Sequence, residues 1–141
     1  DSNPIFSENM QYAKGCDRII MTGNVPKEDV YSHMAAFDVL VHPTYREGFG
    51  KVLQEAMGMS VPIITTDVPG PSEVVENGVS GILCRVKDYG DLAEKMEKLY
   101  ANRELREELA KAGRASAEKY FDRPIMLDNI LKDLNKIVNE E

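Results

Sequence analysis

The chain has 141 residues, with 17 basic and 24 acidic side chains and a formal net charge of −7. This length allows one domain with a single core, and 43% hydrophobic with 29% charged residues exclude a disordered chain. The acidic balance argues against nucleic acid or an anionic membrane as a partner, because such surfaces neutralise phosphates with lysine and arginine.

Residues 1–17 open the chain with a pattern typical of a helix end and a loop. A doubly wound α/β domain usually opens with a strand instead. We therefore expect the chain to begin inside a fold, with the first strands and a partner domain lying outside it.

Between residues 18 and 85, apolar runs alternate with helical patterns. The predicted strands are residues 18–22, 38–42, 61–65 and 81–84. The predicted helices are residues 26–37, 50–58 and 71–76. This alternation is typical of right-handed βαβ units, and continuous apolar strands indicate helices on both faces. The predicted fold class is therefore α/β, with a Rossmann-like parallel sheet and flanking helices.

A helical tail is predicted from residue 91 to residue 141. Between residues 91 and 119 the charges cancel, which is typical of solvated helix faces. One apolar stripe of the tail consists of Met126, Ile130, Leu134, Ile137 and Val138. We expect this stripe either to fold onto the same domain or to meet a second copy of the chain, because an amphipathic helix buries its apolar face. The predicted division is 18–90 for the sheet and the ligand site and 91–141 for the tail.

The cysteines and the apolar runs indicate the compartment. Cys16 and Cys84 lack metal-ligand spacing, and the chain has only two histidines, so we expect no metal site and a reducing cytosol. No apolar run approaches the roughly 20 residues that span a bilayer, and we expect no signal peptide. The predicted localisation is cytoplasmic.

Residues 43–58, PTYREGFGKVLQEAMG, hold the densest chemical signal. They follow a predicted strand, pass through a glycine-rich turn and enter a helix, and ligands of open α/β sheets bind at this edge. Gly48 and Gly50 let a ligand approach the backbone closely. The free N–H groups and the partial positive charge of a helix start attract anions, so a diphosphate site is predicted here.

Two carboxylates flank this predicted anion site. Glu47 lies in the loop beside it, and Glu55 falls on the helix flank that Lys51 shares. Glu55 can therefore accept hydrogen bonds from sugar hydroxyls, as an acidic residue does with ribose in dinucleotide folds. The plainer alternative makes Glu47 a capping or solvated carboxylate and Glu55 an ordinary surface residue, since glycine-rich turns also occur for structural reasons.

Further motifs accompany this segment. The runs are Gly23-Asn-Val, Ala36-Phe-Asp-Val, Glu47-Gly-Phe-Gly, Glu55-Ala-Met, Val61-Pro-Ile-Ile, Pro69-Gly-Pro-Ser-Glu73-Val-Val and Asn77-Gly-Val-Ser-Gly-Ile-Leu. Together they resemble the C-terminal domain of family-4 retaining glycosyltransferases, two-domain enzymes of the GT-B type, over most of residues 18–122. The resemblance implies transfer of a hexose from a UDP- or GDP-linked sugar with retention, without a required metal or other cofactor.

The resemblance also assigns roles by position. Glu47 contacts the transferred sugar, which makes it the candidate catalytic residue, and Glu55 hydrogen-bonds the ribose. The turn that begins at Gly48 holds the diphosphate, and Val25 meets the base through its backbone. Backbone N–H groups approach the sugar and the diphosphate at Phe49, Gly50, Lys51 and Val52. Whether Glu47 stabilises the oxocarbenium-like state or orients the sugar stays open.

Three features depart from the family pattern. Residues 1–17 lack the Arg–Lys pair that clamps the diphosphate, and Met59-Ser60 stands where a small residue and glycine are frequent. Lys51 opposes the dipole of its helix. It is either a solvated lysine or, together with Arg46, a supplement to the diphosphate site.

Other polar and aromatic residues have less specific patterns. His42, at a strand end, either faces the donor or is structural, and Glu73 fits a first-turn carboxylate better than a catalytic acid. The pair Tyr120-Phe121 is expected to pack the C-terminal helices.

The sequence therefore predicts the donor-binding lobe of a two-lobed glycosyltransferase, inactive in isolation. Its predicted partners are a nucleotide sugar and an acceptor lobe outside this chain, without nucleic acid, and any membrane contact would come from that other lobe. Tyr45-Arg46-Glu47 resembles enzymes of bacterial surface polysaccharide or lipopolysaccharide synthesis. Two alternatives stay open. A related GT-B sugar-nucleotide epimerase would be distinguished by product analysis, and a non-catalytic nucleotide-binding or interaction module would be tested by nucleotide titration.

Overall fold

The computed structural model describes residue 11 and residues 13–139, which fall into two units divided between Tyr31 and Ser32. In the first unit, residues 18–22 form no strand and are exposed, with an accessible fraction of 82% for Ile20. The strand predicted there is therefore wrong. A strand is stable only beside a neighbour that pairs its backbone groups, and no strand among the described residues pairs with 18–22. The helix end and loop predicted for 1–17 lie mostly outside the described residues.

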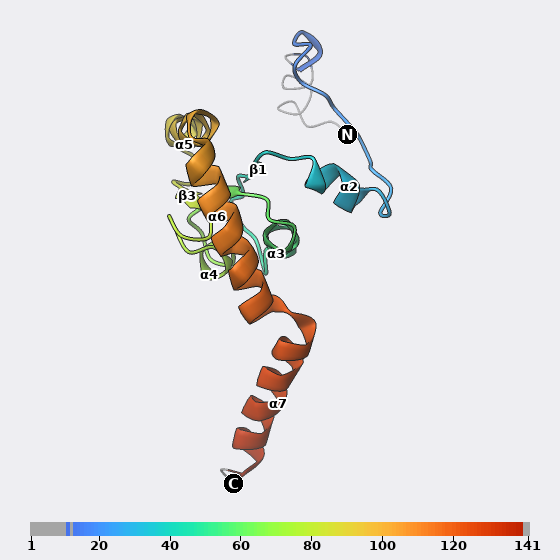
Figure 1. Cartoon of the computed structure of the whole chain (residues 1–141), viewed down its shortest axis with the longest axis vertical. Coiled ribbons are helices and arrows are strands. Elements are labelled where there is room, and N and C mark those ends of the chain that lie inside the picture. The colour runs from blue at the N-terminus through green and yellow to red at the C-terminus, as the bar shows by residue number, and fades with distance from the viewer. Residues whose placement is uncertain (1–10, 12, 140–141) are drawn as a thin grey trace. The chain divides into compact units, whose positions relative to one another are not determined.

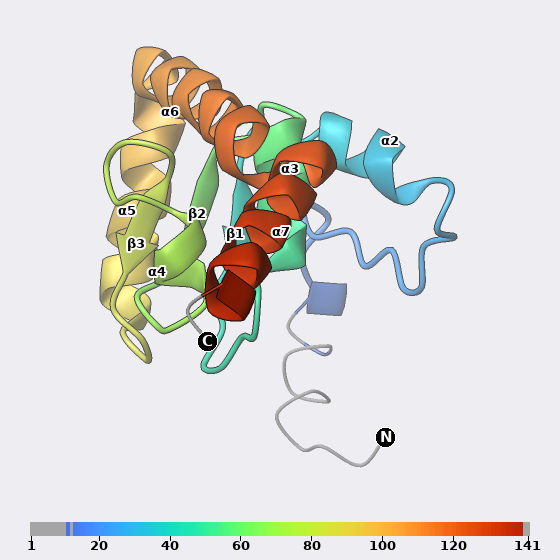
Figure 2. The ribbon, with the colours of Figure 1, turned by 90° about the horizontal axis from the view of Figure 1, so that it is seen from below.

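The second unit contains a three-stranded parallel sheet (Figure 2). Its strands are β1 (Leu40–His42), β2 (Ile63–Thr66) and β3 (Ile82–Cys84), in that spatial order. Val41 is paired with Ile64, and Ile64 with Ile82. The three later strands of the sequence prediction are thus confirmed with slightly different bounds, and the α/β fold class is confirmed with them.

Helices precede, connect and follow the strands along the chain (Figure 1). They are α2 (Val30–Ala35), α3 (Lys51–Gly58), α4 (Pro71–Val74), α5 (Tyr89–Ala101), α6 (Arg103–Ser116), the π-helix η1 (Ala117–Phe121) and α7 (Arg123–Asn139). The predicted helix 26–37 is shorter in the structure, whereas the predicted helices 50–58 and 71–76 correspond to α3 and α4.

The core lies on both faces of the sheet, because successive residues of a strand face opposite sides. Ile63 packs in a cluster with Leu53 of α3 and with part of α4. Its neighbour Ile64 packs in a second cluster with Leu99 of α5 and Leu109 of α6. Each of these side chains is almost fully buried, and such burial contributes roughly 1.5–3 kcal/mol. Helices on both faces, as the apolar strands predict, are therefore confirmed.

The loop after β3 is fastened to the start of α5 by two carboxylates. Asp88 Oδ1 accepts a hydrogen bond from the Asp91 N–H at 2.9 Å, which caps the helix. Asp91 is buried, and its Oδ2 accepts a hydrogen bond from the Arg85 N–H at 2.7 Å. That backbone hydrogen bond, with Lys95 Nζ at 3.4 Å, holds the pKa of Asp91 below its ordinary value. The loop 85–88 is thus held in one conformation.

The apolar stripe of α7 is exposed in the structure. The accessible fractions are 51% for Ile130, 52% for Leu134 and 72% for Val138. The stripe therefore does not fold onto this domain, and contact with a second copy stays a prediction. Of the predicted packing pair, Phe121 packs against the α3 cluster whereas Tyr120 is exposed. Among the described residues, no helix combines the length and the apolar character needed to cross a membrane.

Ser60 follows α3 with a φ of 59°, a left-handed conformation that residues with a Cβ rarely adopt. The glycine that is frequent here in the resembled family fits this conformation better. We expect Ser60→Gly to raise the free energy of unfolding by about 1 kcal/mol, because glycine removes the steric strain. Urea denaturation measures the change. Ser60→Ala is the matched control, since it removes the hydroxyl but keeps the Cβ, and equal stability of the two variants would contradict the prediction.

Candidate functional site

The loop that follows β1 is held against the end of β2. Thr66, the last residue of β2, is buried, and its hydroxyl donates to the Thr44 carbonyl oxygen. The same hydroxyl accepts a hydrogen bond from the Thr44 N–H at 3.1 Å. Thr65 donates its hydroxyl hydrogen to the His42 carbonyl oxygen at 2.9 Å. Because buried hydroxyls require partners, these contacts fix the start of the loop on the sheet.

A second contact positions the middle of this loop. Gly70 precedes α4, and a Cβ atom built there would lie 2.5 Å from the Glu47 carbonyl oxygen and 2.9 Å from that of Gly48. Its φ of 90° also falls where glycine alone is unstrained. The backbones of the two loops therefore pack directly against each other. The sequence does not show this contact of Gly70, although Pro69-Gly70-Pro71 carries a turn signal.

The helix α3 begins directly after the glycine turn. Gly50 is its N-cap residue, with a φ of 59° and a ψ of 42°, and it is buried. The N–H groups of Lys51 and Val52 have no acceptor within the helix, because no helical turn precedes them. Gln54 Nε2 donates to the Phe49 carbonyl oxygen at 3.1 Å, which holds the turn on the helix. This is the geometry that leaves N–H groups and the helix dipole available to an anion.

Glu47 is held beside this turn by two contacts. Its Oε1 accepts a hydrogen bond from the Gly48 N–H at 3.2 Å, and its Oε2 lies 3.5 Å from His42 Nε2. The side chains are 32% exposed for Glu47 and 31% exposed for His42. The carboxylate is therefore oriented and still open to solvent at the carboxyl edge of the sheet. The sequence left the role of His42 open, and the structure places its ring against Glu47.

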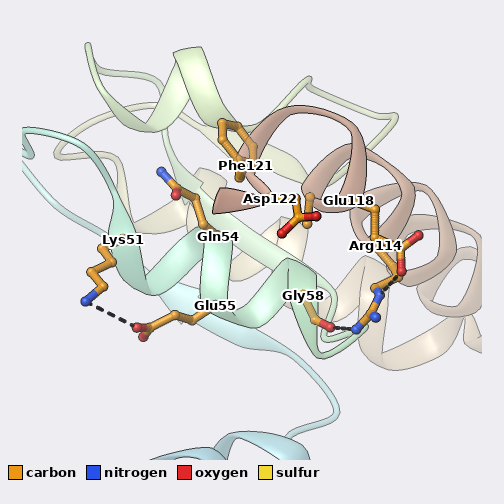
Figure 3. Close-up of a pocket in the computed structure, with 9 residues that line it drawn as sticks. Lys51, Gln54, Glu55, Gly58, Arg114, Glu118, Phe121 and Asp122 are labelled. Atoms are coloured by element: carbon orange, nitrogen blue, oxygen red, sulfur yellow. Dashed lines mark hydrogen bonds and ion pairs between the residues drawn. The ribbon is translucent and has the colours of Figure 1, made fainter. Parts of the chain in front are cut away.

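Glu55 and Lys51 lie on one side of α3 (Figure 3), with Lys51 Nζ 3.8 Å from Glu55 Oε1. The Glu55 side chain is 25% exposed, whereas that of Lys51 is 83% exposed. Both line a groove of about 670 Å³, a size typical of small-molecule sites. The opposite wall comes from the end of α6, from η1 and from the residue after it, with Arg114, Glu118, Phe121 and Asp122. The sequence gives no sign of this wall, because its residues lie in a segment with the pattern of a solvated helix.

Two further expectations concern the base and metal ions. Val25 is half-buried and belongs to the first unit, whereas the α3 residues belong to the second. Its contact with the base stays a prediction. Among the described residues, no three histidine, cysteine, aspartate or glutamate side chains are grouped to hold a metal ion.

The fold and this edge of the sheet define a class of protein. Parallel strands, a glycine-rich turn and a helix N-terminus at the carboxyl edge are typical of nucleotide-binding α/β domains. Residues 6–116 match the family model for glycosyl transferases group 1. The chain therefore belongs to this family of transferases.

Individual relatives agree with this assignment. CapM, a capsular polysaccharide biosynthesis glycosyltransferase of Staphylococcus aureus, is 38% identical over 112 residues, or 79% of this chain and 30% of CapM. Sucrose-phosphate synthase from Thermosynechococcus elongatus matches with a TM-score of 0.83 and 26% identity, over 97% of this chain and 34% of that protein. HepE from Anabaena, in complex with UDP-glucose, matches with a TM-score of 0.82 and 25% identity, over 94% and 36%. The chain thus spans about a third of the length of these relatives.

Proposed function

We propose that this chain is the donor-binding lobe of a retaining glycosyltransferase and that it receives a UDP-linked sugar at the loop between β1 and α3. The observation that supports this most is the glycine turn at the N-terminus of α3, with Glu47 held beside it. A helix start of this kind stabilises a diphosphate through its dipole and its first N–H groups. HepE, which shares the fold, has UDP-glucose bound in its solved structure, and this supports UDP over GDP.

The proposed chemistry is divided between the turn and the two carboxylates. The N–H groups at the start of α3 stabilise the departing diphosphate, since preorganised dipoles stabilise charge as it develops. Glu55 accepts hydrogen bonds from the ribose hydroxyls. Glu47 either stabilises the positive charge that develops on the anomeric carbon or orients the sugar. The attacking hydroxyl belongs to an acceptor placed by the second lobe.

The acceptor class is proposed from the relatives. CapM is named for capsular polysaccharide biosynthesis and is 38% identical over the matched region. This supports a bacterial surface polysaccharide as the product of the full-length protein. Product analysis with that protein distinguishes transfer from epimerisation of the donor.

Nucleotide titration tests the donor site. Glu55→Gln is expected to weaken UDP binding by roughly 10- to 150-fold, because a hydrogen bond to a charged group contributes about 1.5–3 kcal/mol. Isothermal titration calorimetry with UDP, GDP and ADP measures the effect, and UDP is expected to bind most tightly. Glu97→Gln is the matched control, since Glu97 is exposed on α5, which covers the other face of the sheet.

Several outcomes of this titration would contradict the proposal. Equal UDP affinity in the unsubstituted chain and in Glu55→Gln would contradict the assignment of Glu55 to the ribose. Failure of all three nucleotides to bind would contradict the proposed donor site. Lys51→Ala separates the two interpretations of that lysine. If Lys51 supplements the diphosphate site, UDP binding weakens at low salt and the loss shrinks as salt is added. Unchanged affinity would leave it a solvated lysine, whose exposed pair with Glu55 contributes little stability.

A further inference from the structure

A second pocket, of about 120 Å³, lies at the carboxyl ends of β2 and β3. The loop after β1 also contributes to it, so three neighbouring loops of the sheet meet there. Its polar and aromatic lining residues are Tyr45, Thr66, Arg85, Lys87, Asp88 and Tyr89. Among the described residues, this pocket shares no lining side chain with the groove beside Glu55. It is therefore a separate feature of the same edge.

Two tyrosines that line this pocket are exposed to solvent. The hydroxyls of Tyr45 and Tyr89 lie 3.4 Å apart, although the residues are 44 positions apart in the sequence. Their accessible fractions are 62% and 75%. The hydrogen bond between the two hydroxyls raises the pKa of Tyr45 above its ordinary value. The pair presents two apolar ring faces and two hydroxyl groups to solvent. Aromatic residues of this kind contact ligands that are partly apolar and partly polar.

The acidic side chains near this pocket are already paired. Asp88 Oδ2 lies 3.0 Å from the Arg85 guanidinium, and its Oδ1 caps α5 through the Asp91 N–H. Asp91 Oδ1 lies 3.4 Å from Lys95 Nζ and 3.8 Å from the Arg85 guanidinium. The exposed Glu94 also lies 3.4 Å from Lys95 Nζ. Of this cluster, only the ion pair of Arg85 and Asp88 lines the pocket itself.

Lys87 adds one positive charge to the pocket lining, where Arg85 and Asp88 balance each other. Its Nζ lies 5.8 Å from the centroid of the Tyr45 ring, and no carboxylate of the described chain forms a salt bridge with it. Its φ is 62°, a conformation that residues with a Cβ rarely adopt. Strain of this kind persists where the surroundings hold a residue in place, and it is concentrated at ligand sites. The ammonium group of Lys87 thus lies over an aromatic ring beside the pocket.

The volume of the pocket limits what it can enclose. A space of about 120 Å³ corresponds to roughly four water molecules in the liquid. A phosphate or carboxylate group fits such a space, whereas complete small-molecule ligands occupy roughly 300 Å³ or more. A larger ligand would therefore place its anionic group inside and the rest of its body on the exposed tyrosine rings.

We propose that this pocket is a subsite for a saccharide that carries one oxyanion, either a phosphate or a carboxylate. Lys87 contacts the oxyanion, and the rings of Tyr45 and Tyr89 contact the sugar. In a glycosyltransferase such a ligand is a part of the acceptor distant from the attacking hydroxyl, which the second lobe places, and this part of the assignment rests on the proposed function. The subsite itself follows from the lysine, the two tyrosines and the cavity between them.

Amide NMR of the ¹⁵N-labelled chain tests the subsite with glucose 6-phosphate, glucuronate, glucose and inorganic phosphate as probes. We expect the amide signals of Tyr45, Lys87 and Tyr89 to shift with one or both anionic sugars. Glucose and inorganic phosphate should each bind more weakly than the anionic sugar by about tenfold or more. A tighter sugar phosphate identifies the oxyanion as phosphate, and a tighter glucuronate identifies it as carboxylate. Inorganic phosphate binding as tightly as the anionic sugars, or the absence of shifts with both of them, would overturn the proposal.

Substitutions provide the second readout. Lys87→Ala and Tyr89→Ala are each expected to weaken binding of the anionic sugar by about tenfold or more. Lys87→Gly removes the same positive charge, and glycine adopts the positive φ without strain. This variant therefore tests the lysine even if the alanine variant misfolds. The matched controls are the exposed residues Lys111 and Tyr100, each changed to alanine, and an equal loss in these would overturn the proposal. UDP affinity is measured in parallel: a chain that fails to bind UDP contradicts the proposed function, whereas only the anionic-sugar titrations decide the subsite.

Discussion

Replacing Gly70 by alanine is expected to lower the free energy of unfolding by roughly 3 kcal/mol and to abolish UDP binding. An alanine at a φ of 90° carries a steric cost of about 1–2 kcal/mol. Its methyl group would lie 2.5 Å from the Glu47 carbonyl oxygen, so the backbone must move, at a further cost of about 1–3 kcal/mol. The segment that must move bears Glu47 and the glycine turn. Binding is therefore lost even under conditions where the variant stays folded.

Gly78→Ala is the matched control for this substitution. Gly78 has a φ of 78°, but a Cβ atom there meets no atom within 4 Å. It therefore incurs only the conformational cost of about 1–2 kcal/mol, and UDP binding should be retained. Chemical denaturation and calorimetric titration of the two variants measure both effects. Equal stability losses, or UDP binding retained in Gly70→Ala, would show that the contact with the Glu47 loop is unimportant.

The parts of the fold that were predicted correctly depend on local signals. Residues 61–64 are an unbroken apolar run, so the strand follows from its own segment. Gly48 and Gly50 mark the turn before a helix with apolar residues at helical spacing, so α3 follows from its segment as well. Residues 18–22 have the same kind of local pattern and still form no strand. A strand also needs a partner, and a partner is not a property of the segment itself. The exposed stripe of α7 illustrates the same limit, because the sequence shows an apolar face but not what covers it.

In the candidate site, too, some features follow from the sequence of one segment and others do not. The glycine turn and the two glutamates lie within one short segment, so their spacing alone shows that they share the end of a strand and the start of a helix. The contacts that fix them are not local. Gly70 against the Glu47 backbone and the Tyr45–Tyr89 hydroxyl pair both join different loops of the sheet. No pattern in a single sequence shows that two residues so far apart require each other.

Glu47→Gln is expected to lower kcat of the proposed full-length transferase by roughly 10²- to 10³-fold while leaving UDP affinity nearly unchanged. Glutamine keeps the size of the side chain and can still accept the hydrogen bond from the Gly48 N–H, but it removes the negative charge. That charge matters most when the anomeric carbon becomes positive, which happens in the transition state and not in the bound donor. Steady-state kinetics and UDP titration measure the two quantities separately.

Glu73→Gln is the matched control, since Glu73 is an exposed carboxylate in the first turn of the neighbouring α4, and its kcat should stay close to that of the unsubstituted enzyme. A comparable loss in this variant would mean that any acidic residue at this edge has the same effect. Glu47→Asp then separates the two roles left open by the sequence. Aspartate keeps the charge but shortens the reach, so a role in stabilising charge predicts partial recovery of kcat relative to glutamine. A role in orienting the sugar predicts that both variants lose kcat equally and raise KM for the donor, because both alter the contact with the sugar.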